Sequence, residues 1–141
     1  MFKMILVALD GSEGSFKALR AAIDLAASCS GAELHSISIE EDLPQYVATV
    51  GEFEEVKEQK DAFFEKINAE AVALAKARGV TLITHVMPGH EVQGIVEFCA
   101  DGGFDMLVVG FMGHSRIFER VWGSTSQSLT RLAPCSVLVA K

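Results

Sequence analysis

The sequence is poor in cysteine, and it lacks both a long apolar run and an excess of basic side chains. Its three cysteines, Cys29, Cys99 and Cys135, are odd in number and widely spaced, with no Cys-x-x-Cys pair and no zinc-ligand spacing. We therefore expect buried, reduced thiols. No apolar run approaches the roughly twenty residues of a membrane span, and the N-terminus lacks the apolar stretch of a signal peptide. We expect a cytoplasmic protein.

Basic side chains are outnumbered, because 12 Lys and Arg stand against 19 Asp and Glu, for a net charge of −7. A surface that binds duplex nucleic acid needs clustered Lys and Arg to displace the counterions of the phosphates. An anionic membrane would repel the chain for the same reason. We expect neither a nucleic-acid nor a membrane partner, and any bound phosphate must be held by local geometry such as backbone N–H groups.

Half of the 141 residues are hydrophobic and 22% are charged, which is the composition of a packed globular chain. A chain of this length fits one domain, expected over residues 1–141. The near-continuous apolar run Met4–Leu9, which ends at Asp10-Gly11-Ser12, is predicted to be a strand buried on both faces. The other predicted strands are Leu34–Ile39, Val80–Val86, Met106–Val109 and Ser136–Ala140.

Segments with helical spacing separate these runs, and the last of them, after Gly123, is expected to bury Leu129 and Leu132. This order, with right-handed crossovers, predicts an α/β fold. We expect a single-domain, open, doubly wound, Rossmann-like parallel sheet of five strands in the order 3-2-1-4-5, with helices on both faces. In such a sheet, ligands bind beyond the carboxyl ends of the strands, where the strand order reverses.

The loop after the fourth predicted strand has the composition of a phosphate-binding segment. It reads Gly110-Phe111-Met112-Gly113, then nine residues, then Gly123-Ser124-Thr125-Ser126. Glycines permit positive φ and a close approach to a ligand, and the first N–H groups of a helix attract anions. The hydroxyls of Ser124 and Ser126 would add donors. Each glycine alone could merely make a turn, whereas the whole spacing favours phosphate binding.

This loop, in which Gly-x-x-Gly is followed by nine residues and then by Gly-Ser, resembles the pattern that ATP-binding universal stress proteins carry between their fourth strand and last helix. The segments Ile5–Glu13, Phe104–Gly110 and Ala133–Val139 are also similar to that family. The resemblance covers essentially the whole chain, apart from a stretch from about Leu43 to Phe53. It implies an ATP ligand, or AMP or ADP, accompanied by Mg²⁺ or Mn²⁺.

The resemblance also implies roles for individual residues. Asp10 would lie beside the ribose and phosphates and help to hold the divalent cation. Ile39 would contact the adenine, and Gly110 would approach the ribose. The remaining implied positions are Ala8 and Leu9 in the floor, and Gly113, Gly123, Ser124 and Thr125 around the phosphates, beside Ser126 in the same helix start.

Other polar and aromatic residues carry weaker signals. His35, His85 and His90 show no ligand spacing with one another, and we assign them no role. Trp122 and Phe118 are expected to pack on the last helix or on a partner chain rather than on a base.

No motif for covalent catalysis is present: the chain has no Gly-Lys-Ser/Thr phosphate loop, no Gly-x-Ser-x-Gly and no His-Glu-x-x-His. Our leading hypothesis is a regulatory stress-response module in which ATP occupancy changes the recruitment of a protein partner of unknown identity. The alternatives are a nucleotide-independent dimeric adaptor and a slow Mg²⁺-dependent ATPase, so catalysis stays open. AMP, ADP or a cyclic nucleotide also stay open as the natural ligand.

The closing strand, Ser136–Ala140, is apolar and is expected at the edge of the sheet, followed only by Lys141. An unprotected edge strand favours pairing with a second copy. We therefore expect a homodimer through this strand, as the family resemblance also implies.

Overall fold

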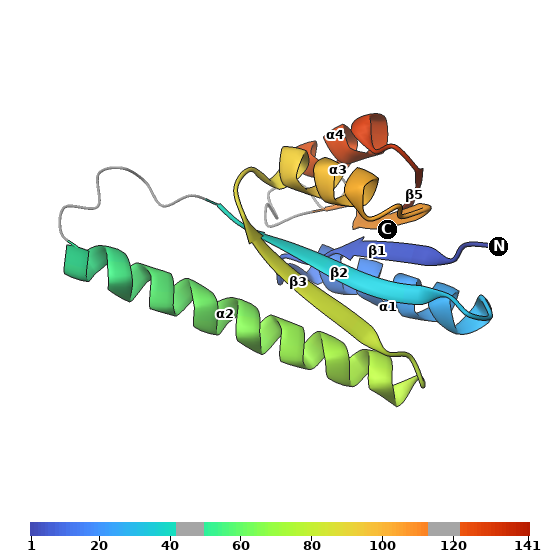
Figure 1. Ribbon diagram of the computed structural model, residues 1–141, viewed down its shortest axis with the longest axis horizontal. Coiled ribbons are helices and arrows are strands. Elements are labelled where there is room, and N and C mark those ends of the chain that lie inside the picture. Colours follow the sequence, from blue (N-terminus) through green and yellow to red (C-terminus); the bar gives the residue numbers. More distant parts are fainter. Residues whose placement is uncertain (42–49, 113–121) are drawn as a thin grey trace.

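The computed structural model describes residues 1–41, 50–112 and 122–141, and everything below concerns these residues (Figure 1). Within them, parallel strands form one sheet in the order β3-β2-β1-β4-β5, which confirms the predicted fold class and strand order. The strands are β1 (Met4–Ala8), β2 (Glu33–Glu40), β3 (Leu82–Pro88), β4 (Met106–Gly110) and β5 (Ser136–Ala140).

The helices of the described residues cover both faces of the sheet: α1 and α2 lie on one face, and α3 and α4 on the other (Figure 1). Their bounds are α1 (Glu13–Ser28), α2 (Val50–Ala77), α3 (Glu91–Asp101) and α4 (Ser124–Leu132). The last helix thus begins where the glycine pattern predicted a helix start.

The core is divided by the sheet because successive side chains of a strand point to opposite faces. In β1, Ile5 and Val7 pack towards α1 and α2, whereas Leu6 between them packs towards α3 and α4. All three side chains are fully buried. A central strand covered on both faces therefore reads as a continuous apolar run, which made it recognisable in the sequence.

The third strand is displaced from its predicted position, Val80–Val86. Gly79 has φ +71°, and the Val80 N–H donates to the Ala75 carbonyl over 2.9 Å, so Val80 lies in the turn that closes the C-terminal end of α2 and not in the strand. At its other end, β3 includes Pro88, which pairs with Glu40. Proline is tolerated here because β3 is an edge strand.

The inward face of α4 is narrower than predicted. Leu129 is buried, but Leu132 is 52% exposed, so the prediction that Leu132 points inward is wrong. Leu132 is the last residue of α4, and Ala133 turns into an extended conformation that leads to β5. About half of Leu132 therefore remains exposed at that turn.

Candidate functional site

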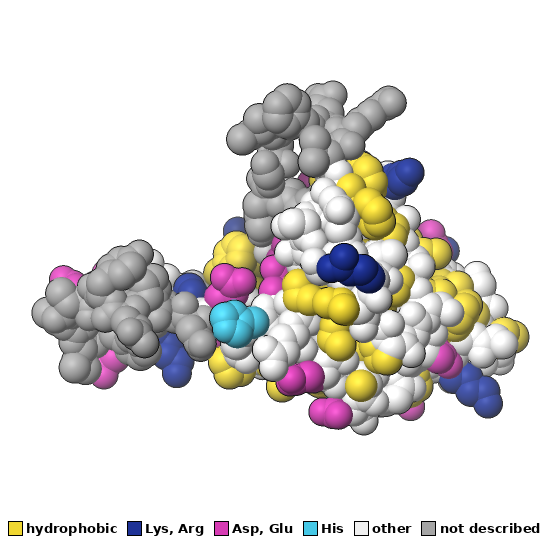
Figure 2. Space-filling view, turned by 90° about the horizontal axis from the view of Figure 1, so that it is seen from above, with side chains coloured by type: hydrophobic (Ala, Val, Ile, Leu, Met, Phe, Trp, Pro, Cys, Tyr) yellow, Lys and Arg dark blue, Asp and Glu magenta, His cyan; other side chains and the backbone are white. Residues whose placement is uncertain are grey.

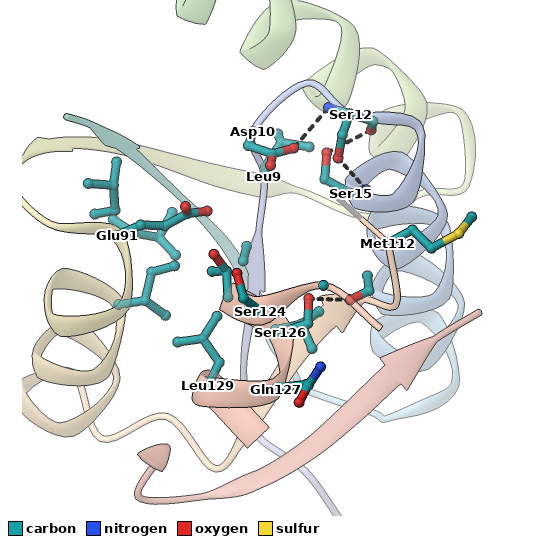
Figure 3. Close-up of a pocket in the computed structure, with 18 of the residues that line it drawn as sticks. Leu9, Asp10, Ser12, Ser15, Glu91, Met112, Ser124, Ser126, Gln127 and Leu129 are labelled. Carbon is teal, nitrogen blue, oxygen red and sulfur yellow. Dashed lines mark hydrogen bonds between the residues drawn. The ribbon is translucent and has the colours of Figure 1, made fainter. Parts of the chain in front are cut away.

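A pocket of about 410 Å³ lies at the carboxyl ends of β1, β2 and β4, between these strands and the first turns of α3 and α4 (Figure 3). Strand β1 pairs with β2 on one side and with β4 on the other, so this is the point at which the strand order reverses. The structure brings nine predicted site residues to its wall: Ala8, Leu9, Asp10, Ile39, Gly110, Gly123, Ser124, Thr125 and Ser126. The tenth, Gly113, lies outside the described residues.

One end of the pocket is apolar. Buried aliphatic side chains from four different elements line it, and the sequence analysis did not single them out because their pattern is that of core residues. They are Ile37, Ile95, Val109 and Leu129. A Cβ atom at Gly94 of α3 would come within 3.0 Å of Ile39 Cδ1, so this helix packs closely on the end of β2.

The other end of the pocket is formed by the start of α4. Gly123 is its N-cap residue and supplies no capping side chain, with φ −58° and ψ 141°. The first N–H groups of a helix have no acceptor within the helix and carry the positive end of its dipole. Figure 3 shows Ser124 at this start, facing the space between Glu91 and Leu129. An anion or a polar ligand group in the pocket would meet donors here.

The hydroxyl group of Ser126 forms a hydrogen bond within the protein, so it does not serve a ligand as we expected. It donates to the Gly110 carbonyl and so ties the first turn of α4 to the end of β4. The Ser126 carbonyl in turn accepts a hydrogen bond of 2.7 Å from Thr130 Oγ1. The prediction that the Ser126 hydroxyl adds a donor for the ligand is therefore wrong, because its proton is engaged.

Gly110 is required for packing and not for a positive φ, contrary to the sequence-based interpretation. Among the described glycines, neither Gly110 nor Gly123 has a positive φ. A Cβ atom at Gly110 would lie 2.6 Å from the Gly14 carbonyl oxygen, because the first turn of α1 crosses the end of β4 there. The absent side chain thus permits two backbones to meet beside the pocket.

The Asp10–Ser12 turn closes the end of β1. Asp10 Oδ1 accepts a hydrogen bond of 2.8 Å from the Ser12 N–H, and Ser12 Oγ accepts one of 3.1 Å from the Ser15 N–H at the start of α1. Ser38 Oγ donates to the Leu9 carbonyl over 2.7 Å from the neighbouring strand. These bonds fix the half-buried Asp10 carboxylate at the edge of the pocket (Figure 3).

The charged side chains that line the described part of the pocket are both acidic, Asp10 and Glu91. Sequence reasoning missed Glu91, which is the first residue of α3 and becomes part of the site only through the path of the chain after β3. The described residues include no group of three or more His, Cys, Asp or Glu side chains arranged to hold a metal ion. A divalent cation here would need ligand oxygens besides the protein carboxylates.

Phe111 and Trp122, which lie on either side of residues 113–121, contact each other. The Gly123 N–H donates to the Phe111 carbonyl over 2.8 Å, and the rings of Phe111 and Trp122 stack with centroids 6.3 Å apart. Phe118 lies outside the described residues. Trp122 packs on Phe111, and its carbonyl accepts a hydrogen bond of 2.8 Å from Gln127 Nε2 of the last helix, α4. Its indole N–H is buried and has no acceptor among the described residues. Met112 points away from Ser124 and Leu129 (Figure 3).

Two histidines that received no role from their spacing are in direct contact. His35 Nδ1 lies 2.9 Å from His85 Nε2, and the rings stack at an angle of 4° on the neighbouring strands β2 and β3. His35 Nε2 also contacts Glu33 Oε2 at 3.2 Å. Burial, followed by the charge of His35, lowers the pKa of His85 below its usual value of 6.5. The pair lies outside the pocket lining.

Comparisons with known proteins agree with this fold. The family model of the universal stress proteins matches residues 1–141. A universal stress protein encoded beside a QAH/OAS sulfhydrylase gene of Thermus aquaticus is 32% identical, with all of both chains covered. The solved UspA of Lactobacillus plantarum, 20% identical, has a TM-score of 0.88 over 99% of this chain and 98% of its own. A universal stress protein solved with cAMP is 28% identical, with a TM-score of 0.73 over 99% and 97% of the two chains.

None of the helices in the described part of the chain combines the length and hydrophobicity that a membrane span requires.

Proposed function

The chain is a member of the universal stress protein family, and we propose that it is a regulatory module that binds an adenine nucleotide, ATP, in the pocket beside α4. A volume of about 410 Å³ lies in the ordinary range for small-ligand sites. The pocket has an apolar end suited to a base and an N–H-rich end suited to phosphates. The related universal stress protein that holds cAMP supports an adenine nucleotide as the ligand class.

The observation that carries this proposal is the start of α4. Gly123 leaves the first turn without a side-chain cap, and Ser124, Thr125 and the Ser126 backbone face the pocket. Because the described lining contains no Lys or Arg, the neutral N–H groups and the helix dipole are the attraction that it offers to phosphate.

The base would occupy the apolar end. Ile39, Ile95 and Leu129 approach this space from β2, α3 and α4 and offer aliphatic surface to a planar ring. Leu129 is 1% exposed and Ile95 is 2% exposed, whereas Ile39 is half-buried, so Ile39 has the most surface of the three to offer a base. Burying a base there removes apolar surface from water, which contributes roughly 25 cal/mol per Å².

Asp10 would help to hold Mg²⁺ or Mn²⁺ together with the phosphate oxygens of the nucleotide. Its carboxylate lies at the pocket edge, with Oδ1 already accepting the Ser12 N–H. Asp10→Asn keeps an acceptor for that N–H and removes the negative charge. We expect this variant to lose affinity for Mg²⁺–ATP, whereas affinity for metal-free AMP stays the same or rises.

Calorimetric titration of the protein with Mg²⁺–ATP, AMP and cAMP tests the proposal, with Ser124→Asp as the informative variant. A carboxylate in the first turn favours the helix through its dipole, so folding is retained, but it repels phosphate. We expect nucleotide affinity to fall at least tenfold, which is about 1.4 kcal/mol.

Ser30→Asp is the matched control, because it makes the same charge change at an exposed serine in the turn between α1 and β2, outside the pocket. It should bind as the unaltered protein does. No measurable binding of any of the three nucleotides at millimolar concentration, or equal loss in both variants, would contradict the proposal.

A second candidate function is a dimeric adaptor that works without nucleotide and recruits a protein partner. Strand β5 pairs with β4 and forms the edge of the sheet in the described structure. Leu138 is 36% exposed and Leu132 is 52% exposed. Figure 2 views the molecule from the side of α3 and α4 and shows hydrophobic side chains in groups between isolated charged ones.

Pairing of two β5 strands would give a homodimer. Light scattering should then show a dimer at micromolar concentration, and Leu138→Lys should shift it towards the monomer. If partner binding and the dimer both persist in Ser124→Asp, the adaptor function is favoured over nucleotide-dependent regulation.

A further inference from the structure

Cys99 and Cys135 lie against each other under α3 and α4. Their Sγ atoms are 3.2 Å apart, although the residues are separated by 36 positions in the chain. Cys99 belongs to the buried cluster that includes Ile95 and Leu129, and Cys135, immediately before β5, packs on the same cluster. Cys99 is 1% exposed, whereas Cys135 is half-buried. A reagent in solvent therefore reaches Cys135 first.

The two sulfur atoms are in direct non-bonded contact. A disulfide places them at about 2.05 Å, so small rotations of both side chains would close the gap of 3.2 Å. The third cysteine, Cys29, is the C-cap residue of α1 on the opposite face of the sheet. It is therefore not placed to compete for either sulfur. The pairing is determined by the fold, and the spacing along the chain contained no indication of it.

We propose that Cys99 and Cys135 form a reversible dithiol–disulfide pair that a low-molecular-weight disulfide, such as oxidised glutathione, oxidises. This inference is independent of the nucleotide proposal, because neither cysteine is among the residues that line the pocket. All three cysteines are free thiols in the structure, as expected, but Cys135 is only half-buried where we expected a buried thiol.

The oxidation takes place in two exchange steps. The Cys135 thiolate attacks one sulfur of the small disulfide, forms a mixed disulfide and releases one molecule of thiol. The Cys99 thiolate then attacks the Cys135 sulfur of the mixed disulfide, which forms the protein disulfide and releases a second molecule of thiol. The protein loses two electrons and two protons, and the small disulfide takes them up as two thiols.

The environment of Cys99 sets the order of these steps. Burial, then the hydrogen bond and the charge of Cys135, raises the pKa of the Cys99 thiol to about 12. Two of these three causes come from Cys135 itself and disappear once Cys135 carries the mixed disulfide. Cys99 therefore becomes more reactive after the first step, and the second step should accelerate with rising pH.

The disulfide would enclose the segment that forms the polar end of the pocket. The covalent loop from Cys99 to Cys135 contains β4, Gly110 and all of α4. A cross-link over 36 positions removes loop entropy from the unfolded chain. The oxidised protein should unfold on the order of 10 °C above the reduced protein. Oxidation would thus produce a more persistent form of the same fold.

The test uses the full chain, treated with oxidised glutathione and then alkylated, followed by intact mass and peptide mapping. We expect the loss of two hydrogen atoms, a Cys99–Cys135 peptide cross-link within one chain, a higher melting temperature and full reversal by dithiothreitol. In Cys99→Ala the glutathione adduct should persist on Cys135, because the resolving thiol is absent. Cys29→Ala is the matched control and should form the cross-link as the unaltered protein does.

Three results would overturn the proposal: free Cys99 and Cys135 after excess oxidant, a glutathione adduct on Cys135 of the unaltered protein that never resolves, or a disulfide between two chains. Mapping the unaltered protein decides among these outcomes, so the inference remains testable even if Cys99→Ala does not fold.

Discussion

The N-terminal ends of α1 and α4 both lie at the carboxyl edge of the sheet, and they are capped differently. At the start of α1, Ser12 caps the helix, and Ser15 Oγ donates to the Ser12 carbonyl over 2.9 Å. At the start of α4, the N-cap is Gly123, which has no side chain to offer. Both starts border the same pocket. The protein thus caps the first turn of α1 with its own side chain and leaves the first turn of α4 uncapped beside the pocket.

This contrast explains how an acidic chain can attract phosphate. The α1 start is occupied by its own serines and by the turn around Asp10, which leaves it little capacity for an anion. The α4 start lies opposite an apolar wall, where water competes less for the N–H groups.

The largest effect is expected where the start of α1 meets the end of β4, beside the start of α4. In Gly110→Ala the new Cβ would lie 2.6 Å from the Gly14 carbonyl oxygen and would force α1 away from β4. We expect the free energy of unfolding, measured with urea, to fall by about 3 kcal/mol. Gly51→Ala is the matched control, because a Cβ atom added at this position in α2 would meet nothing within 4 Å. It should leave stability unchanged or raise it by about 0.5 kcal/mol. A neutral Gly110→Ala would mean that the start of α1 and the end of β4 are not in close contact.

A smaller effect is expected from removing the cap of α1. Ser12→Ala removes the acceptor of the Ser15 N–H and leaves α1 without a side-chain cap, as α4 already is. The free energy of unfolding should fall by about 1 kcal/mol. Urea unfolding measures this loss, and Ser12→Asp, which restores a capping oxygen, should recover most of it. An unchanged stability in Ser12→Ala would show that the cap contributes nothing at this site.

The smallest effect concerns a region remote from both starts, the His35–His85 pair. The pKa of His85 is lowered in the folded protein from 6.5, first by burial and then by the charge of His35. As pH falls below 6.5, the unfolded chain therefore binds a proton before the folded protein does. Stability should be fully present above this pH and should decline as the pH falls towards the lowered pKa.

Melting temperatures measured across this range should show that His85→Phe reduces the decline, because the ring packing on Phe98 is kept and the titrating group is lost. His90→Gln, at an exposed position, is the control and should keep the decline. A decline that is identical in all three proteins would place the acid sensitivity elsewhere.

The sequence was most informative where local patterns decide the structure. Continuous apolar runs marked β1 and β4, and the Gly123-Ser124 step marked the beginning of α4, because buried strands and helix starts have characteristic compositions. Since parallel strands end at one edge, these patterns also placed the candidate site, including Asp10 and Gly110.

The sequence was least informative where distant side chains meet. The contact of His35 with His85 depends on the register of β2 and β3, and that of Cys99 with Cys135 depends on how α3 packs beside the turn into β5. The spacing of these residues along the chain gives no indication of either contact. The need for glycine at position 110 was likewise misinterpreted, because the residue that a Cβ atom there would meet, Gly14, lies in another element, α1.

Gly123→Asn tests the central contrast most directly, because it gives α4 the kind of cap that α1 has. At the Gly123 backbone angles, φ −58° and ψ 141°, an asparagine side chain can accept the first N–H groups of the helix. Calorimetric titration with Mg²⁺–ATP should show an affinity at least tenfold weaker, about 1.4 kcal/mol, while stability to urea stays the same or rises slightly. Undiminished nucleotide affinity in a folded Gly123→Asn protein would contradict the account.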